Sequence, residues 1–449
     1  MKKMALFSVI VTMAAGAAFA QFASGNYFGA RGLFTLVPLE LRTVNEPADS
    51  RNKDNDMTAA VGQYWGGAFG RIELKWRGQN SSMGYEGTLL TDTGTVRIDA
   101  ANVWLKPLSW MKLTIGQFAD DKLRGNFVEG NELPNFVLNT GSADFGADDV
   151  IFHLFHGGDS NNPQKWGGAM LTLTPINNLY VGVVLPAGLG GIVTNATEQS
   201  AGGETAKSIY SRVQAGVGYW IDNVGIARVQ YVGKPEDNMN LAGLMAIWEK
   251  GDPYKPTNYK NDATSRVEAA FCFNGVNNMV LDVGVKYFLP KTEELTYLGK
   301  PLDLVYNPGI VFGLGWRLRV DNFAVTLLGA GHLLDGYIYD NVDVKNEFSH
   351  GMNLNFHLIP SYNLGFGFVG LNLGMDMTAK DTLNGKEIEG TGQTNYGGGV
   401  WFRKYMGADC FVLTGFTYTY LGVPGGGKRP PNSVTGYFRI PIIVEVNFQ

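Results

Sequence analysis

The chain has 449 residues, a net charge of −5 and only 17% charged residues. Hydrophobic residues make up 45% of it, so the composition excludes a disordered protein and a coiled coil. The mildly acidic charge of the whole chain also argues against a nucleic-acid-binding protein. Glycine, with 60 residues, is nearly twice as frequent as the average of about 7%, and aromatic residues reach 12%.

Residues 1–20 have the features of a secretory signal peptide. Two early lysines supply the positive start, and a mostly apolar stretch follows over 4–15. The sequence Ala-Phe-Ala at 18–20 is a small-x-small cleavage site, which leaves 21–449 as the exported domain. An uncleaved N-terminal anchor is the alternative, although the apolar stretch is short for a lasting membrane span.

Beyond the signal peptide, hydrophobic residues recur with a period of two, which is typical of β-strands that have two different faces. In 70–77, Ile72, Leu74 and Trp76 alternate with four charged residues. In 310–320, large apolar residues alternate mainly with glycine and arginine. No run in this part of the sequence has the unbroken apolar bulk that a transmembrane helix needs.

The connections between these segments alternate between short and long. The short ones contain residues that favour tight turns, as at 176–178, 222–223 and 321–322. The long ones lie near 38–57, 188–207, 234–262, 289–306, 334–348, 378–391 and 422–433. Short periplasmic turns, long outer loops and an apolar outward band are the layout of outer-membrane barrels. Because lipid cannot satisfy the open edge of a sheet, such a sheet has to close.

We therefore predict an all-β fold, a closed antiparallel transmembrane β-barrel of about 18 strands, with 16 or 20 as alternatives. The expected strands lie near 26–37, 64–78, 83–92, 95–107, 110–118, 165–174, 178–187, 208–220, 223–233, 263–274, 278–288, 307–319, 322–333, 349–359, 362–377, 393–404, 408–421 and 434–448. An even number of strands places both ends of the barrel domain on the side of the short turns.

This architecture resembles that of general porins, the diffusion channels of Gram-negative-type outer membranes. The most specific local likeness is 112–118 with the following connection 119–164, which resembles the fifth strand and inward-folded third loop of porins. The last segment ends in Phe448 and is similar to the terminal strand that serves as an assembly signal for the barrel-assembly machinery, although Gln449 follows here. The resemblance implies an outer-membrane location, contact with lipid, small hydrophilic solutes and a possible homotrimer. No motif identifies a porin subfamily.

Basic side chains outnumber acidic ones on the strand faces opposite the large apolar residues. The predicted pore-wall basic residues are Arg71, Lys75, Arg77, Arg97, Lys106, Lys112, Arg212, Arg228, Arg266, Lys286, Arg317, Arg319, Arg403 and Arg439. The predicted acidic residues of the same wall are Glu73, Asp99, Glu268, Asp282 and Glu445. The wall would then carry an excess of nine positive charges within a chain that is acidic overall.

The predicted constriction loop, 119–164, is acidic. Its carboxylates are Asp120, Asp121, Glu129, Glu132, Asp144, Asp148 and Asp149. Folded inward as in the porins it resembles, this loop would face the basic wall across the pore. Because arginine rings favour anions, we predict a water-filled pore for passive diffusion of small hydrophilic solutes, with a mild anion preference. The alternative for any single arginine is that it pairs with a carboxylate and braces the barrel.

Two other functions stay open on the sequence. A surface antigen or adhesin would also use long acidic loops. A fatty-acid-type transporter would carry hydrophobic solutes, although the strongly charged wall and the early first strand argue against it. Neither an enzyme nor a cofactor is expected, because none of the five histidines lies in a recognisable catalytic motif. His153 and His156 could be considered for a metal, but no third ligand is specified.

Two smaller questions concern cysteine and aromatic residues. Cys272 and Cys410 are far apart in the sequence, and their pairing is left open. Aromatic residues near strand ends, among them Tyr180, Trp220 and Tyr362, are predicted to lie at the lipid boundary.

Overall fold

The computed structural model describes the strands and most short turns of the chain. The described residues are 26–44, 57–60, 71–92, 95–117, 167–186, 213–233, 265–297, 300–307, 309–333, 336–341, 344–407, 410–426 and 433–448. The predicted signal peptide and the predicted constriction loop lie outside these ranges. No helix in the described part of the chain is long and apolar enough to cross a membrane.

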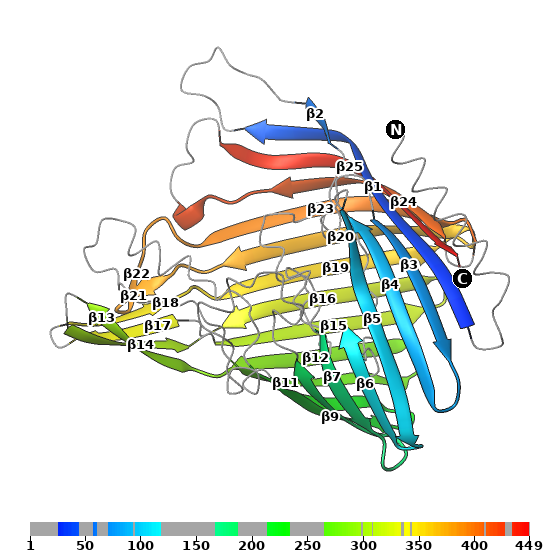
Figure 1. Cartoon of the computed structure of the whole chain (residues 1–449). Helices are drawn as coiled ribbons and strands as arrows, with labels where there is room; N and C mark the ends of the chain where they lie inside the picture. Colours follow the sequence, from blue (N-terminus) through cyan, green and yellow to red (C-terminus); the bar gives the residue numbers. More distant parts are fainter. Residues whose placement is uncertain are drawn as a thin grey trace.

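Eighteen antiparallel strands form a closed barrel (Figure 1), as predicted. They are β1 (Asn26–Val44), β3 (Arg71–Gln79), β4 (Met83–Asp92), β5 (Thr95–Leu108), β6 (Met111–Gln117), β7 (Gly167–Leu173), β8 (Leu179–Pro186), β9 (Gln214–Ile221), β10 (Gly225–Val232), β11 (Arg266–Val276), β12 (Met279–Phe288), β15 (Ile310–Val320), β16 (Phe323–Leu333), β19 (Asn353–Asn363), β20 (Gly367–Thr378), β23 (Gln393–Tyr405), β24 (Phe411–Tyr420) and β25 (Val434–Phe448). Each of these strands pairs with the next one in this order.

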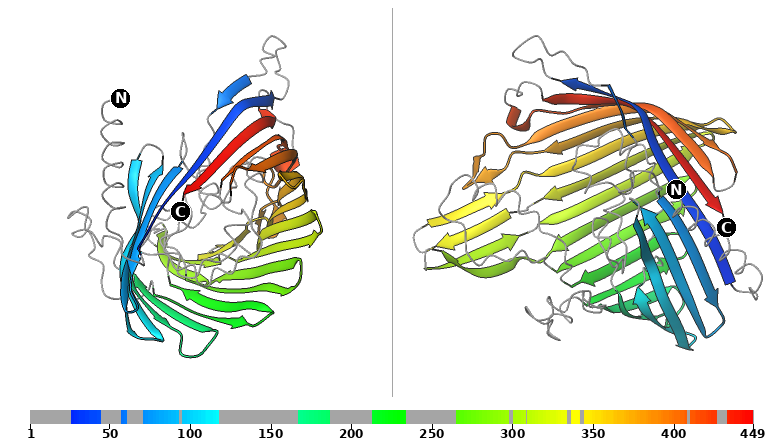
Figure 2. Two further views of the ribbon diagram at one scale, coloured as in Figure 1. Left: turned by 90° about the vertical axis from the view of Figure 1, so that its right-hand side faces the viewer. Right: turned by 45° about the horizontal axis from the view of Figure 1, so that its top comes forward.

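The first and last strands close the barrel. β1 pairs with β25 from Ala30 opposite Phe448 to Val44 opposite Val434. Figure 2 shows the two strands side by side, with the described start of β1 and the end of β25 toward the same end of the barrel. This pairing leaves no open edge in the eighteen-stranded cycle, which is the arrangement that lipid requires.

The short turns lie at the same end of the barrel as the start of β1. Asn178, Asn223, Asn278 and Asp321 occupy these turns with φ between 52° and 68°. Asn and Asp tolerate this left-handed conformation better than other non-glycine residues, which explains the turn composition noted in the sequence. The short turns predicted there are thus confirmed.

A second sheet of six strands extends the barrel on the side of the long connections (Figure 1). It consists of β13 (Lys291–Tyr297), β14 (Lys300–Asn307), β17 (Gly336–Asn341), β18 (Val344–Ser349), β21 (Thr382–Leu383) and β22 (Lys386–Glu387). A further short strand, β2 (Met57–Ala60), pairs with the outer part of β1, and a 3₁₀ turn, η2, spans Pro424–Gly426. These elements were not predicted, because their segments lack the continuous apolar face of the barrel strands.

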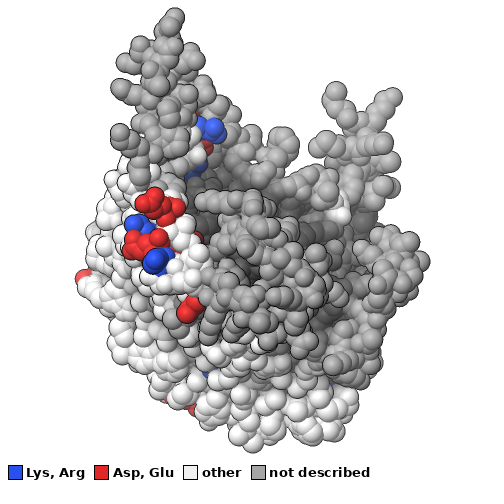
Figure 3. All heavy atoms as spheres, turned by 90° about the vertical axis from the view of Figure 1, so that its left-hand side faces the viewer, with Lys and Arg blue, Asp and Glu red and all other residues white. Residues whose placement is uncertain are grey.

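The flank of the barrel shows less charge than this extension. Figure 3 views the molecule from the end where the six-stranded sheet projects, and there a few basic and acidic side chains lie in one mixed group. The described flank below them shows only a few small patches of charge. In the extension, the ion pair between Lys380 and Glu387 is 2.8 Å long and both side chains are largely exposed.

Asp381 anchors the connection that carries β21 and β22. Its Oδ1 accepts a hydrogen bond from the Gly351 amide at 2.8 Å and lies 3.7 Å from His350 Nδ1. Burial by itself raises the pKa of Asp381, but the interaction with His350 and the amide bond outweigh burial, so the pKa lies below its ordinary value.

Replacing Asp381 by Asn should loosen this connection above the ordinary pKa of an aspartate. When folding lowers the pKa of a carboxyl group, the ionised group stabilises the folded state. This stabilisation is fully present above the unfolded-state pKa and is lost as the pH falls through the folded-state pKa. Hydrogen exchange of the 379–392 amides, corrected for intrinsic rates, should therefore be faster in D381N at neutral pH and should converge with wild type in acid. E387Q is the control, because the exposed pair that it removes contributes little. Equal protection of D381N and wild type at neutral pH would contradict the assignment.

The outer face of the barrel carries large apolar side chains that remain exposed. Examples are Val103 at 55%, Val400 at 51% and Phe416 at 58% exposure. Tyr362, one of the predicted boundary aromatics, is also exposed, at 47%. Tyr180 and Trp220 differ from the prediction: they contact each other edge to face in a buried cluster with Met170. The alternation of β8 and β9 places both rings on the inner face.

Aromatic rings lie over glycines of the neighbouring strand, which accounts for part of the excess of both residue types. A Cβ atom added at Gly84 would lie 2.4 Å from the ring of Trp104, and one added at Gly370 would lie 2.4 Å from the ring of Trp401. A side chain at either position would displace the ring, so these glycines are required by packing rather than by backbone conformation.

The sequence suggested an inner face made only of small and charged residues. The structure shows that part of this face is apolar. A buried apolar cluster includes Leu328, Ile359, Trp401, Leu413 and Ile443. Leu413 and Ile443 are directly opposite each other on β24 and β25, and both are fully buried. Period-two alternation predicts which residues share a face, but it does not predict that part of the inner face is also apolar.

Candidate functional site: the inner face of the barrel

The inner face can be assigned from burial. Charged and polar side chains such as Glu268, Asp282 and Arg228 are at most 4% exposed, whereas their neighbours along the same strands, Val267, Val283 and Val229, are at least 37% exposed. In a single-layered barrel, the buried face is the inner one. Of the predicted basic residues, eleven have described side chains, and all share a strand face with buried residues: Lys75, Arg77, Lys106, Lys112, Arg228, Arg266, Lys286, Arg317, Arg319, Arg403 and Arg439.

Some of the predicted residues cannot be placed. Arg212 and all the predicted carboxylates of the constriction loop lie outside the described residues, as do His153 and His156. The side chains of Arg71, Arg97, Asp99 and Phe448 are also outside the description, although their backbones belong to strands. Cys272 and Cys410 do not form a disulfide with each other. In the described ranges, no three His, Cys, Asp or Glu residues are grouped in a way that could hold a metal ion.

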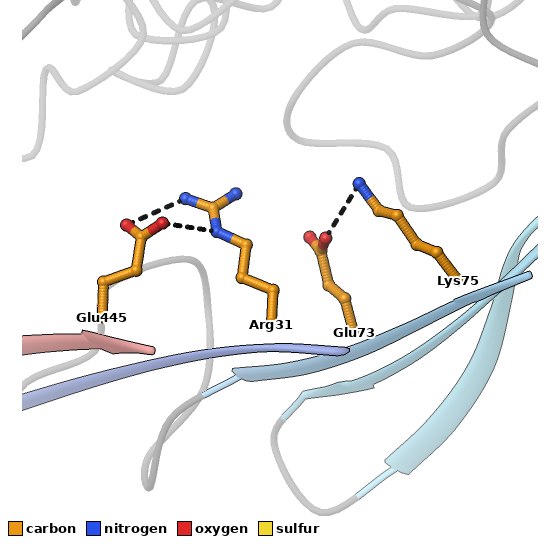
Figure 4. Close-up of polar contacts among 4 residues, drawn as sticks. All are labelled: Arg31, Glu73, Lys75 and Glu445. Carbon is orange, nitrogen blue, oxygen red and sulfur yellow. Dashed lines mark hydrogen bonds and ion pairs between the residues drawn. The ribbon is translucent and has the colours of Figure 1, made fainter. Parts of the chain in front are cut away.

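Four charged residues form an alternating group across the closing strands (Figure 4). Arg31 on β1 donates two hydrogen bonds to Glu445 on β25, from Nε at 3.0 Å and from Nη2 at 3.1 Å. Arg31 is also directly opposite Glu73 on β3, and Glu73 forms an ion pair of 3.2 Å with Lys75. Two bases and two acids cancel, so this group braces the seam and adds no net charge to the inner face.

A second group crosses the same seam closer to the long connections. Glu40 accepts hydrogen bonds from Arg439 Nε at 2.8 Å and from Arg42 Nε at 2.9 Å. Both guanidinium groups also lie over the ring of Tyr437, at 4.4 Å for Arg439 and 5.9 Å for Arg42. One carboxylate thus serves two arginines, and the group keeps one net positive charge.

A third group lies on β10, β11 and β12. Arg266 pairs with Glu268 at 2.5 Å, and Glu268 also accepts a hydrogen bond from Gln230. Lys286 is directly opposite Glu268 in the sheet register. With the buried Arg228 and Asp282 added, three bases meet two acids. The group is therefore braced as well, with a small positive excess.

Other basic residues contact aromatic rings. Arg77 lies 4.9 Å from the ring of Tyr27, Lys106 lies 5.1 Å from the ring of Trp104, and Arg403 lies 4.0 Å from the ring of Phe411. A ring face attracts a cation without neutralising it. Arg77 is also directly opposite Glu86, so among these three residues Lys106 and Arg403 contribute most to the positive potential inside the barrel.

Five charged residues of the inner face were not predicted. They are Arg31, Glu40, Arg42, Glu86 and Asp376. Glu40 lies beyond the predicted end of the first strand, which in fact continues to Val44. Glu86 is directly opposite Arg77, and Asp376 is 3% exposed. Two added bases and three added acids reduce the predicted positive excess by one, so the inner wall is slightly less basic than expected.

The two faces together define the class of protein. A closed antiparallel barrel with an apolar, aromatic outer band and a charged and polar interior is the architecture of an outer-membrane barrel. The outward band satisfies lipid, and the interior is compatible with water.

Comparisons with known proteins give likenesses in fold. No family model and no curated protein matches the chain. OmpT of Vibrio cholerae, in its trimer form, is 10% identical with a TM-score of 0.43, and the match covers 95% of this chain and 100% of that chain. An anion-selective porin from Comamonas acidovorans is 9% identical with a TM-score of 0.42, covering 94% and 100%. OprD of Pseudomonas aeruginosa is 10% identical with a TM-score of 0.45, covering 95% and 96%. At such values, the likenesses carry no conclusion about a solute.

Proposed function

We propose that the chain is an outer-membrane porin that forms a water-filled pore for small hydrophilic solutes. The observation that carries the proposal is the contrast between the two faces of a closed barrel: exposed apolar residues outside and buried charged residues inside. An interior with this many charged groups has to be hydrated or paired, whereas a barrel for hydrophobic solutes has no use for them.

A mild anion preference is the finer part of the proposal. It is supported by two basic side chains that contact rings, Lys106 and Arg403, and by the single positive charge left in the group around Glu40. The ion pairs of the seam argue that the preference is modest, because they cancel part of the basic wall. An inward fold of 119–164, with its carboxylates opposite the wall, is part of the proposal, as are recognition of Phe448 during assembly and a homotrimeric state.

Reversal potentials in a KCl gradient test the electrostatic part. The wild-type channel should show the sign of an anion-selective pore, and R403Q should move the reversal potential toward zero, because it removes a positive charge from the inner face. K404Q is the matched control: Lys404 is the next residue, exposed on the outer face. Cation selectivity of the wild type, or equal shifts in R403Q and K404Q, would overturn the proposed anion preference.

A surface antigen or adhesin is the second candidate, and it is favoured by the six-stranded sheet that extends beyond the barrel. Such a sheet could present a binding surface whether or not the barrel conducts. Liposome swelling separates the two functions: entry of small sugars supports a pore, and impermeable liposomes support a barrel that only displays its outer part.

A further inference from the structure

We propose that the inner wall between β20 and β25 contains a discrete oxyanion-binding site formed by Asn372, Trp401, Thr417 and Arg439 around Gly399. These residues are called the donor cluster below. This inference rests on the proposed pore function, because solutes reach the inner wall only through an open pore. It adds a chemical class of solute and one place on the wall where that solute binds.

The sheet register brings the donor cluster together. Asn372 on β20 is directly opposite Gly399 on β23, Gly399 is opposite Thr417 on β24, and Thr417 is opposite Arg439 on β25. Trp401 lies two residues beyond Gly399, so its side chain leaves β23 on the same face. Neighbouring strands are about 4.8 Å apart, so Asn372 and Thr417 are separated by roughly 10 Å across the glycine.

All four side chains of the donor cluster are buried and carry a polar group without a partner. Their exposures are 0% for Asn372, 6% for Trp401, 1% for Thr417 and 8% for Arg439. Asn372 Nδ2, Trp401 Nε1, Thr417 Oγ1 and Arg439 Nη1 have no hydrogen-bond partner among the described residues. Burying unpaired polar groups costs free energy, so four such groups on four neighbouring strands indicate a ligand that supplies missing partners.

The unpaired groups select an acceptor. The amide, indole and guanidinium nitrogens can only donate, and the threonine hydroxyl can donate as well. The carbonyl side of Asn372 is already engaged, because its Oδ1 lies 3.2 Å from His357 Nδ1. A ligand that only accepts hydrogen bonds, through several oxygens close together, fits these four donors best. An alcohol or a sugar fits them less well, because its hydroxyl groups also need acceptors. Carboxylate, sulfate and phosphate share that property.

The local charge is compatible with an anion. Arg439 and Arg42 share one carboxylate, Glu40, so one positive charge remains beside the cluster. Asp376 is the other acid that faces this part of the wall, and its Oδ2 accepts a hydrogen bond from Asn395 Nδ2 at 3.4 Å. Three of the four donors are neutral, which makes the site distinct from a simple row of basic residues.

Gly399 allows Thr417 to pack closely against β23, so a side chain at this position would displace Thr417. A Cβ atom added there would lie 2.8 Å from the Thr417 Cγ2 atom and 2.8 Å from the Phe416 carbonyl oxygen. Gly398, the preceding residue, has the opposite orientation, and an added Cβ would meet Leu373 at an ordinary 3.4 Å. The two adjacent glycines therefore give a matched pair of alanine substitutions, one inside and one outside the barrel.

Equilibrium binding to the refolded full chain in detergent tests the site without requiring conduction. Titration calorimetry with sodium sulfate and sodium acetate should show saturable binding of at least one oxyanion, and acetamide, the neutral analogue of acetate, should not bind. T417V should weaken binding about fivefold, because it removes one hydrogen bond, whereas T414V on the outer face of the same strand should leave binding unchanged. G399A should weaken binding further, and G398A should not.

The outcomes separate the site from the pore. If KCl conductance is normal but neither oxyanion binds, or if T417V binds like wild type, the oxyanion site is overturned while the pore stands. If one oxyanion binds and T417V weakens it but bilayers show no conductance, the site stands and the pore function fails. Binding of sulfate alone or of acetate alone identifies which oxyanion the donor cluster accepts. Barrel formation of every variant is checked by the mobility difference between heated and unheated samples in SDS gels.

Discussion

Replacing Arg31 by glutamate should destabilise the closed barrel by about 2 to 3 kcal/mol. The change removes both hydrogen bonds to Glu445 and places three carboxylates on adjacent strands, because Glu73 lies directly opposite position 31. Losing one partner of a buried ion pair costs about 3 to 5 kcal/mol, and the lower value applies here because Arg31 is 32% exposed. Urea unfolding of the refolded protein in lipid vesicles, followed by tryptophan fluorescence, measures the effect.

The reversed pair separates the ion pair from its surroundings. In R31E/E445R, the attraction across β1 and β25 is restored with opposite polarity, so stability should recover in part, although Glu73 then faces a carboxylate at position 31. Recovery would show that the seam is held by this pair and not by the size of the arginine side chain. An R31E variant as stable as wild type would contradict the bracing role.

Replacing Phe416 on the outer face by arginine should lower the free energy of unfolding by about 2 to 4 kcal/mol. The reason is that a charge near the middle of the lipid-facing band has to leave water. Phe416 is 58% exposed in the middle of β24, and its ring lies 6.2 Å from that of Phe438. The measurement is again reversible unfolding in vesicles. This prediction follows directly from the assignment of the outer face to lipid.

The matched control is Phe366→Arg in the short turn between β19 and β20. Phe366 is 62% exposed, and its ring lies 6.1 Å from that of Phe402, so both variants lose one exposed ring and one ring contact. At the end of the barrel, an arginine side chain reaches the interface between lipid and water. This substitution should therefore lower the free energy of unfolding by only about 0 to 1 kcal/mol. Equal costs for F416R and F366R would mean that the outer face is not immersed in lipid.

The barrel strands were predictable because each one repeats the same local pattern. The predicted strand 83–92 coincides with β4, and the predicted 434–448 coincides with β25. β1 was predicted too short, because its second half, up to Val44, lacks clean alternation. The six-stranded extension was missed, since its strands are ordered by pairing with one another and have no continuous apolar face to signal them.

The inner wall was predictable in its orientation but not in its charge. Alternation places residues such as Lys75, Arg403 and Arg439 opposite the apolar face. The pairing of these residues could not be inferred, because it depends on strand register. Tyr180 and Trp220 were assigned to the wrong side because aromatic residues near strand ends occur on both faces.

Strand number, closure and the division into two faces are therefore properties of the linear sequence. Period-two alternation and turn residues act within each strand and its nearest connection, so they can be recognised without knowing the neighbours. The effective charge of the interior depends on the folded barrel. Arg31 and Glu445 are 414 residues apart, and only closure of β1 on β25 brings their opposite charges within 3.0 Å. The same closure places Arg439 beside Glu40, and the Arg439 Nη1 atom then remains for the donor cluster. Both arrangements depend on strand register, because register decides which side chains lie opposite each other on neighbouring strands.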